Sequence, residues 1–417
     1  MRNDANGIVV IGAGHAASEF AGALRAGGFS GPVLMLGEEA HLPYQRPPLS
    51  KAFLSGEAPH GALELKSAAA YEKMGVEVRT GARVAAIDRR EHRIELEHGG
   101  SEYYGKLVLA TGGRARRLAA RGLENGAMPA NLHYLRTLAD AAPIRELLHP
   151  GSRLVIIGGG YVGLEVASVA RRRGLEVTVL EALPRLLARV TAAEISAFYE
   201  QIHHDAGVAI RTCATVRRIE TDPTDAAVVA VHTEDEVIAA DLVLAGVGQI
   251  PNVELAQHCG LAVDNGVVVD EHSRSSDPDV FAIGDCSNHP SALYRRRLRL
   301  ESVPNAVGQA RAAAATLCGS PRPYDAVPWF WSDQYDLKLQ MVGLSHGHDR
   351  VITRGRPEER SFVAFYLEAG RIIAADAVNR PKDFLAAKRL VGEQLQIAPE
   401  SLADESRPLQ SAAGTVN

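Results

Sequence analysis

Glycines spaced as Gly12-x-Gly14-x-x-Ala17 are the first residues whose types suit a definite chemistry. In a turn between a strand and a helix, Gly12 permits the tight turn and Gly14 lets the backbone approach a pyrophosphate. The small Ala17 lets helix and strand pack closely, so that a phosphate can lie at the helix N-terminus. The pattern therefore predicts the phosphate end of a dinucleotide site. A Gly-rich turn without a ligand is the alternative.

An acidic residue stands where such a site needs one. The apolar run Val33–Leu36 indicates a second strand, and Glu38 follows it, 21 residues after Ala17. A carboxylate at about this distance hydrogen-bonds the ribose in dinucleotide-binding folds. The apolar run before Gly12 indicates the strand that precedes the turn, buried on both faces of a parallel sheet.

The same design occurs a second time. The run at 153–157 leads into Gly158, Gly160 and Gly163, and a further apolar run ends at Glu181, 18 residues after Gly163. Two complete fingerprints are far more specific than one and predict two bound nucleotides.

The second acid also predicts which nicotinamide cofactor is used. Glu181 can accept hydrogen bonds from a ribose 2′-hydroxyl and repels a 2′-phosphate, which favours NADH over NADPH. Arg185 and Arg189 weaken that inference, because cations can accommodate a 2′-phosphate.

Other apolar runs end in small residues that can pass close to a bound nucleotide. One run ends at Ala110-Thr111-Gly112, which we expect beside the first site, and another ends at Gly248. A third ends at Gly284-Asp285, where the carboxylate could meet a ribityl chain or a phosphate region. A common Gly-Asp turn is the alternative there.

A stiff loop follows Glu38. Pro47-Pro48 prevents helix continuation, Ser50 is a predicted cap of a new helix, and Lys51 brings a cation. Because functional residues are often carried on loops of rigid scaffolds, Lys51 is a candidate functional residue, with a plain connector as the alternative.

The remaining segments indicate further elements. The alternation over 76–96 predicts an antiparallel hairpin or meander, and 207–248 is also strand-rich. Helices are expected to start near Thr137 and to cover 305–317. The last 90 residues alternate and then end in a helix and a polar tail, which predicts a separate α+β domain.

Length and composition limit the class of protein. The 417 residues suggest about three domains, and 23% charged and 46% apolar residues with a mean hydropathy of −0.07 are typical of a globular protein. We expect no membrane span, and the net charge of −5 argues against a generally basic, nucleic-acid-coating chain. The four cysteines lack paired spacing, which disfavours disulfides and zinc and fits a reducing cytoplasm.

Several motifs resemble one family. Pro47-Pro-Leu-Ser-Lys51, Glu301-Ser-Val-Pro-Asn305, Trp329-Phe-Trp-Ser-Asp-Gln-Tyr335 and Asp376-Ala-Val-Asn-Arg-Pro381 resemble the FAD-containing, NADH-dependent ferredoxin reductases of bacterial oxygenase systems. The resemblance covers nearly the whole chain. It implies an α/β fold with two Rossmann-like, glutathione-reductase-like domains and a C-terminal α+β domain. The implied boundaries are 1–114 and 250–327 for FAD, 115–249 for NAD and 328–417 for the C-terminal domain.

The resemblance also implies site residues. For the FAD adenosine and pyrophosphate these are the first-fingerprint residues Gly12, Gly14, His15, Ala16, Ala17 and Glu38. For the remainder of the FAD pocket they are Lys51 at the isoalloxazine ring, Val84, Ala110, Thr111, Gly112, Arg136, Asp285, Val303 and Trp331. For NADH they are Gly158, Gly160, Tyr161, Val162, Gly163, Glu181 and Gly248. Glu165 would lie beside the nicotinamide, paired with Lys51, and these two are the expected catalytic residues.

Cysteines separate the relatives of this fold. Dithiol reductases and thiol peroxidases need a cysteine soon after the first ribose acid, and residues 39–60 contain none. Cys286 is expected to be a small buried residue rather than a redox thiol. His15 and His203-His204 fit no metal pattern, so we expect packing or capping roles and no metal site.

The expected activity is electron transfer from NADH through FAD to a 2Fe–2S ferredoxin that supplies a haem monooxygenase or similar oxygenase. Arg295, Arg296, Arg297 and Arg299 form either a docking patch for an acidic ferredoxin or an ordinary solvated face. Reduction of rubredoxin or another small acceptor, and an NADH-binding flavin redox sensor, are the alternative functions.

Overall fold

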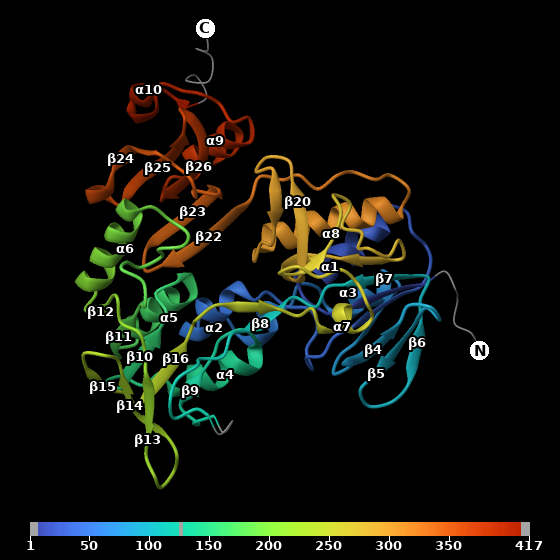
Figure 1. The fold of residues 1–417 in the computed structure, drawn as a ribbon, viewed down its shortest axis with the longest axis horizontal. Coiled ribbons are helices and arrows are strands. Elements are labelled where there is room, and N and C mark those ends of the chain that lie inside the picture. Colours follow the sequence, from blue (N-terminus) through green and yellow to red (C-terminus); the bar gives the residue numbers. More distant parts are fainter. Residues whose placement is uncertain (1–6, 125–127, 410–417) are drawn as a thin grey trace. The chain divides into compact units, whose positions relative to one another are not determined.

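The computed structural model describes residues 7–124 and 128–409, which divide into two compact units (Figure 1). Unit 1 comprises Met1–Gln45, His60–Arg114 and Gln249–Pro328, and unit 2 comprises Arg46–Pro59, Ala115–Gly248 and Trp329–Asn417. Each unit is described by itself.

A five-stranded parallel sheet forms the centre of unit 1, in the order β19-β7-β1-β2-β3. Its strands are β1 Ile8–Ile11, β2 Val33–Leu36, β3 Val76–Arg79, β7 Lys106–Leu109 and β19 Val280–Ala282. All four residues of β1 are buried, as expected for a strand covered on both faces. Because the strands are parallel, the turns after β1, β7 and β19 meet at one edge.

Helices α1 and α8 lie side by side against this sheet (Figure 1). Helix α8 starts at Val303 because Ser302 caps it through a hydrogen bond from the Asn305 backbone. The helices of unit 1 are α1 His15–Ala26, η2 His60–Leu63, α3 Ala68–Lys73, α7 Glu254–His258, η3 Gly284–Cys286 and α8 Val303–Leu317. The smaller strands are β4 Val84–Asp88, β5 Arg93–Leu96, β6 Ser101–Tyr103, β17 Gln249–Pro251, β18 Val267–Val268, β20 Ser287–Ser291 and β21 Arg296–Leu298, and β17 pairs with β8 Gly113–Ala115.

The predicted antiparallel hairpin over 76–96 is partly wrong. Strands β4, β5 and β6 form an antiparallel meander, whereas β3 is the parallel edge strand of the large sheet. As an edge strand, β3 is only partly buried, so its residues alternate like those of an antiparallel strand.

Unit 2 repeats the parallel design. Its first sheet has the order β12-β11-β10-β16-β9, with strands β9 Leu132–His133, β10 Arg153–Ile157, β11 Glu176–Leu180, β12 Ala209–Arg211 and β16 Leu242–Ala245. Strands β13 Arg218–Thr221, β14 Val228–His232 and β15 Val237–Ala239 form an antiparallel meander. The helices are η1 Pro47–Ser50, α2 Ala52–Ser55, α4 Leu138–Leu147, α5 Tyr161–Arg172 and α6 Ala193–Asp205. The predicted start of α4 is confirmed, because Thr137 and Asp140 form a capping box.

The C-terminal part of unit 2 is an antiparallel sheet with two helices (Figure 1). Its order is β22-β23-β26-β25-β24, with β22 Trp329–Gln334, β23 Leu337–Gly343, β24 Arg350–Arg356, β25 Ser361–Glu368 and β26 Arg371–Val378. The helical turns are η4 Pro357–Glu359, α9 Pro381–Gly392 and α10 Pro399–Ala403. Phe198 of α6 packs edge-on against Phe362 of β25 with ring centres 5.0 Å apart, so this sheet and the parallel sheet share one apolar cluster.

The contacts group one segment differently from the sequence analysis. Arg46–Pro59, which the sequence analysis included in the FAD domain, belongs to unit 2, and so do the C-terminal residues. Leu54 is fully buried in the same cluster as Ile144 and Leu164. The division into three domains stays a prediction. Within the described residues, every helix is too short or too polar to cross a membrane.

Candidate functional site

The first fingerprint forms an open glycine turn at the N-terminus of α1. Gly12 has φ +113°, and a Cβ there would lie 2.1 Å from the Ala110 carbonyl oxygen, so only glycine fits. Gly14 begins the helix without any side-chain cap, and a Cβ there would have no neighbour within 4 Å. Ala17 is fully buried against the sheet. Open space above uncapped N–H groups fits a pyrophosphate, and therefore fits the adenosine-pyrophosphate end of FAD.

Glu38 lies just past β2, at the same edge of the sheet as this turn. Its side chain is 70% exposed, and its nearest cation is the Arg83 guanidinium at 3.5 Å. The carboxylate is therefore accessible to a ribose. His15 and Ala16 form the first turn of α1, and Ala16 is buried.

The turns after β7 and β19 are held by side-chain hydrogen bonds. The Thr111 hydroxyl donates to the Asn252 carbonyl at 2.7 Å, and the Asn252 amide donates back to the Thr111 carbonyl at 2.9 Å. The Gln249 amide donates to Asp285 at 3.0 Å. Gln309 holds the neighbouring turn by accepting from the Gly284 N–H at 2.7 Å. Together with the bond from the Asn252 N–H to the Gly112 carbonyl at 3.0 Å, these bonds fix the backbone of Thr111 and Gly112 and the side chain of Asp285, three predicted FAD contacts.

Three other predicted FAD residues of unit 1 differ in which of their atoms are accessible to a ligand. Val84 is 6% exposed and its side chain packs in the apolar core, so only its backbone is available. Ala110 is buried at the end of β7, where its carbonyl faces Gly12. Val303 is half-buried as the first residue of α8.

The second fingerprint repeats this geometry in unit 2. Gly158 has φ +111°, and a Cβ there would lie 2.4 Å from the Gly246 carbonyl oxygen. Gly163 packs as closely, with its Cβ position 2.3 Å from the Gly158 carbonyl oxygen. Gly160 starts α5 without a side-chain cap and faces open space, and Val162 is 42% exposed. A second pyrophosphate therefore fits here, as NADH would require.

Glu181 is anchored at the end of β11. Its two carboxylate oxygens accept from the Gly159 and Leu183 backbone N–H groups, each at 2.8 Å. The Arg185 guanidinium donates to the Ser196 hydroxyl at 2.5 Å and to the Ala188 carbonyl at 3.0 Å. Arg185 is thus held by its own unit.

Lys51 and Glu165 form a buried ion pair. The Lys51 ammonium lies 2.7 Å from Glu165 Oε2, and their side chains are 18% and 3% exposed. Glu165 is one turn into α5, and Lys51 follows the stiff η1 turn. The pairing that the resemblance implied is therefore present in the structure.

Ser50 is not the predicted helix cap. The N-cap residue of α2 is Lys51, and no side chain caps that helix. Instead the Ser50 hydroxyl donates to Glu165 Oε2 at 2.5 Å. Ser50 is the last residue of η1, one position before the N-cap of α2, and there its hydroxyl proton goes to the buried carboxylate.

The other predicted residues of unit 2 make contacts of their own. The Tyr161 hydroxyl contacts the Met341 sulfur at 2.6 Å, and its ring packs on Phe330. Burial raises the pKa of Tyr161, so the phenol stays protonated. Arg136 accepts from the Arg46 guanidinium through its carbonyl, and Trp331 stacks obliquely on Trp329. Gly248 has φ +106° after the turn that ends β16.

The sequence did not reveal the side chains that hydrogen-bond to Glu165 from β22 and extend to α6. Ser332 donates to Glu165 Oε1 at 2.6 Å, and Gln334 and His203 continue the contacts outward. His203 is fully buried, as the packing expectation required, and His204 is exposed. The one signal in the sequence is the spacing of two between Ser332 and Gln334, which places both side chains on the same face of a strand.

The arginine run is not one uniform patch. Arg297 donates to the Val269 and Asn288 carbonyls, and Arg299 is 12% exposed and pairs with Glu301. Arg295 and Arg296 are exposed. Cys286 is fully buried, and burial raises the pKa of its thiol.

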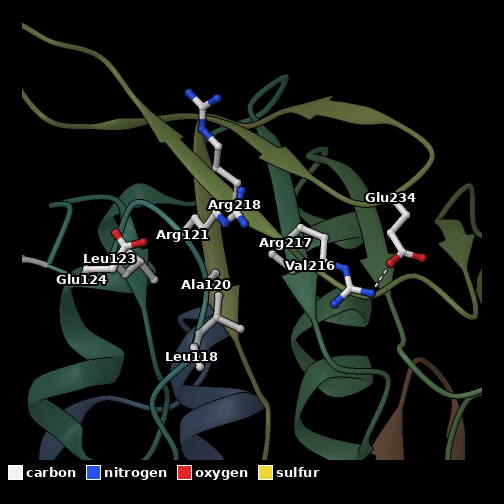
Figure 2. A pocket seen from close by; sticks show the side chains of 10 residues that line it. Leu118, Ala120, Arg121, Leu123, Glu124, Val216, Arg217, Arg218 and Glu234 are labelled. Atoms are coloured by element: carbon white, nitrogen blue, oxygen red, sulfur yellow. Dashed lines mark hydrogen bonds and ion pairs between the residues drawn. The ribbon is translucent and has the colours of Figure 1, made fainter.

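An open groove of about 850 Å³ in unit 2 lies elsewhere (Figure 2). It runs along Leu118–Glu124 and Val216–Arg218, with Arg217 paired to Glu234 at one side. None of its lining residues is a predicted site residue. The glycine turns, rather than this groove, therefore define the candidate site.

Two nucleotide turns on parallel sheets and a buried lysine–glutamate pair define a two-nucleotide oxidoreductase. In agreement, residues 6–310 match the family described as pyridine nucleotide-disulphide oxidoreductase, and residues 329–413 match the reductase C-terminal domain.

Similar proteins narrow the family. Putidaredoxin reductase CamA of Pseudomonas putida is 47% identical over 98% of this chain and 97% of its own, and rhodocoxin reductase of Rhodococcus erythropolis is 42% identical over 97% and 94%. The crystal structure of the covalent putidaredoxin reductase–putidaredoxin complex matches with a TM-score of 0.95 at 46% identity, covering 99% of both chains. The chain belongs to the pyridine nucleotide-disulphide oxidoreductases, and within them to the ferredoxin reductases of bacterial oxygenase systems. The predicted family, fold class, and FAD and nicotinamide cofactors are confirmed.

Proposed function

We propose that this protein passes electrons from NADH through FAD to a 2Fe–2S ferredoxin that serves an oxygenase. One observation carries the proposal: two uncapped helix N-termini with open glycines, each followed by a strand that ends in an acid. The relatives named above, putidaredoxin reductase and rhodocoxin reductase, support the acceptor class.

The first fingerprint holds FAD in this proposal. The backbone N–H groups of Gly14, His15 and Ala16 bind the pyrophosphate, and Glu38 binds the ribose. Asp285 and the fixed Thr111-Gly112 backbone bind the rest of the chain that leads to the ring. We assign further contacts to Ala110, Val84, Arg136, Val303 and Trp331 by resemblance.

The second fingerprint holds NADH rather than NADPH. Glu181 presents its carboxylate to the ribose in one orientation, because two backbone N–H groups fix it. Arg185 cannot turn to a 2′-phosphate without losing its hydrogen bonds to Ser196 and Ala188. Arg185 is therefore a weaker argument against NADH than the sequence alone suggested.

Lys51 and Glu165 serve the reacting rings. Bound NADH and FAD supply the hydride chemistry, and the protein positions the rings and sets the charge around them. Glu165 fixes the direction of the Lys51 ammonium, which would stabilise negative charge on a flavin ring bound beside it. Tyr161, held by Met341, excludes water on the nicotinamide side.

Arg295 and Arg296 are the proposed docking residues for an acidic ferredoxin, since their side chains are exposed and Arg297 and Arg299 are occupied. The four free cysteines fit a reducing compartment, so we place the protein in the cytoplasm.

Anaerobic addition of NADH to the yellow protein tests the function. We expect the flavin band near 450 nm to bleach, and cytochrome c to be reduced only when a 2Fe–2S ferredoxin is added. Faster reduction of rubredoxin than of any ferredoxin would favour the rubredoxin reductase. Bleaching with little electron transfer to any acceptor would favour the redox sensor, and a colourless protein that takes up no flavin would contradict all three.

A further inference from the structure

A chain of buried polar side chains leads from Glu165 to helix α6. Ser332 and Gln334 lie on one face of β22, and His203 lies on α6. The exposed fractions of Glu165, Ser332, Gln334 and His203 are 3%, 0%, 1% and 0%. Polar groups buried this deeply cost free energy unless their hydrogen bonds are complete, so the order of the bonds can be worked out.

The carboxylate fixes the first two bonds. An ionised Glu165 only accepts, so the single Ser332 proton points to Glu165 Oε1, 2.6 Å away. The Ser332 oxygen must then accept, and the Gln334 Nε2 group donates to it at 3.2 Å.

The rest of the order follows. With its amide nitrogen toward Ser332, Gln334 turns its oxygen toward His203 Nε2 at 2.9 Å, so that nitrogen carries a proton. Burial lowers the pKa of His203 to about 4, so the ring is neutral at pH 7 and Nδ1 is an acceptor. The Tyr335 hydroxyl, 3.2 Å from Nδ1, donates to it, and burial raises the pKa of this phenol to about 12.

We propose that Tyr335, His203, Gln334 and Ser332 form a one-way hydrogen-bond relay whose four donors all point toward Glu165, which makes these residues positioning residues of the Lys51–Glu165 pair. Lys51 and Ser50 take the other carboxylate oxygen at 2.7 and 2.5 Å. Each oxygen of Glu165 thus has its own set of donors. The carboxylate is held in a single orientation, and the ammonium that it directs is held with it.

This inference rests on the proposed function for its kinetic part only. Its first test is structural: nitrogen-15 NMR of the purified, histidine-labelled protein at pH 7, with the His203 signal assigned from a His203→Phe variant. We expect a neutral ring protonated at Nε2. A ring protonated at Nδ1 would overturn the relay, whatever the enzyme does.

The second test compares variants of two buried serines. Ser332→Ala should lower the rate constant for flavin reduction by NADH about tenfold, the effect of losing one charge-assisted hydrogen bond, without changing NADH affinity. Ser332→Thr should restore the rate to within about twofold. Ser18→Ala is the matched control, because Ser18 is 1% exposed and accepts from the Tyr71 hydroxyl at 2.8 Å, and none of its hydrogen bonds involves a residue of the relay.

An unchanged rate in Ser332→Ala, or an equal loss in Ser18→Ala, would contradict the relay. Failure of NADH to reduce the flavin of the unmodified protein would contradict the proposed function instead, and the NMR result would still stand.

Discussion

Gly160 and Gly163 are three residues apart, yet a methyl group should act on them in opposite ways. A Cβ at Gly163 would lie 2.3 Å from the Gly158 carbonyl oxygen, whereas a Cβ at Gly160 meets nothing within 4 Å. We expect Gly163→Ala to lower the free energy of unfolding by about 1–3 kcal/mol through overpacking. Gly160→Ala should keep its thermal midpoint but raise the KM for NADH about tenfold, because the methyl group occupies the space of the pyrophosphate. Thermal unfolding and steady-state kinetics measure the two effects, and an unchanged KM in Gly160→Ala would place the pyrophosphate elsewhere.

The charge of Glu181 should decide between the nicotinamide cofactors. Glu181→Gln keeps an oxygen for the Gly159 N–H but removes the charge that repels a 2′-phosphate. We expect kcat/KM for NADH to fall about tenfold and the ratio of NADPH to NADH use to rise, since a hydrogen bond to a charged group contributes about 1.5–3 kcal/mol. Glu176→Gln, at the exposed start of the same strand, is the control. Equal preference shifts in both variants would show that Glu181 does not read the ribose.

Residues that act through the backbone were predictable, and residues that act through remote partners were not. Gly12 and Gly158 follow from the spacing within one turn, and each acid follows from its distance along the same strand–turn–helix–strand segment. The hydroxyls of Ser50 and Ser332 reach Glu165 across 115 and 167 residues of sequence. Only tertiary packing shows that they share one carboxylate.

At the scale of elements, the arginines in and next to strand β21 have two different roles, one structural and one in docking. Arg297 donates to backbone carbonyls of Val269 and Asn288, so its replacement should destabilise unit 1 rather than test docking. Replacing both Arg295 and Arg296 by Glu should raise the KM for a 2Fe–2S ferredoxin about tenfold or more and flatten its dependence on salt. The NADH–ferricyanide activity should not change. Arg90→Glu, an exposed arginine of the β4–β5 turn, is the control. Wild-type ferredoxin kinetics in the double variant would remove these arginines from the docking surface.

Elements with their own end signals were predicted best. The capping box of Thr137 and Asp140 marked α4, and Ser302 starts α8 two residues before the predicted range. Strand β3 was assigned to the wrong sheet, because partial burial at a sheet edge produces the same alternation as an antiparallel strand. Periodicity reports exposure, and exposure alone does not specify a partner strand.

At the scale of the whole molecule, the two repeats made the fold class predictable, but the grouping of segments depended on packing. Arg46–Pro59 joins unit 2 through buried Leu54 and the ion pair of Lys51, neither of which changes the local pattern of the loop. The strands of the C-terminal sheet likewise share a core with the second parallel sheet. An apolar pattern predicts that a segment is buried, but it does not predict which other segment it packs against.

A buried acid in the C-terminal sheet should make the stability of the protein fall as pH rises. Burial raises the pKa of Asp376 to about 7, although a hydrogen bond from the Tyr366 hydroxyl at 2.5 Å lowers it in part. Below about pH 4 the group is protonated whether the chain is folded or not. Between about pH 4 and pH 7 the unfolded chain has released this proton while the folded chain keeps it, so the contribution of Asp376 to folding becomes less favourable.

Asp376→Asn removes this titration and retains an oxygen for Tyr366. We therefore expect the variant to gain stability over the unmodified protein as pH rises from 5 to 8, by on the order of 2 kcal/mol and at most about 1.4 kcal/mol for each pH unit that the titration spans. Denaturant unfolding at both pH values measures the difference, with Asp235→Asn on an exposed loop of the same unit as the control. An Asn variant whose advantage is the same at pH 5 and pH 8 would mean that Asp376 is already ionised in the folded protein, because only a proton held through folding makes the difference depend on pH.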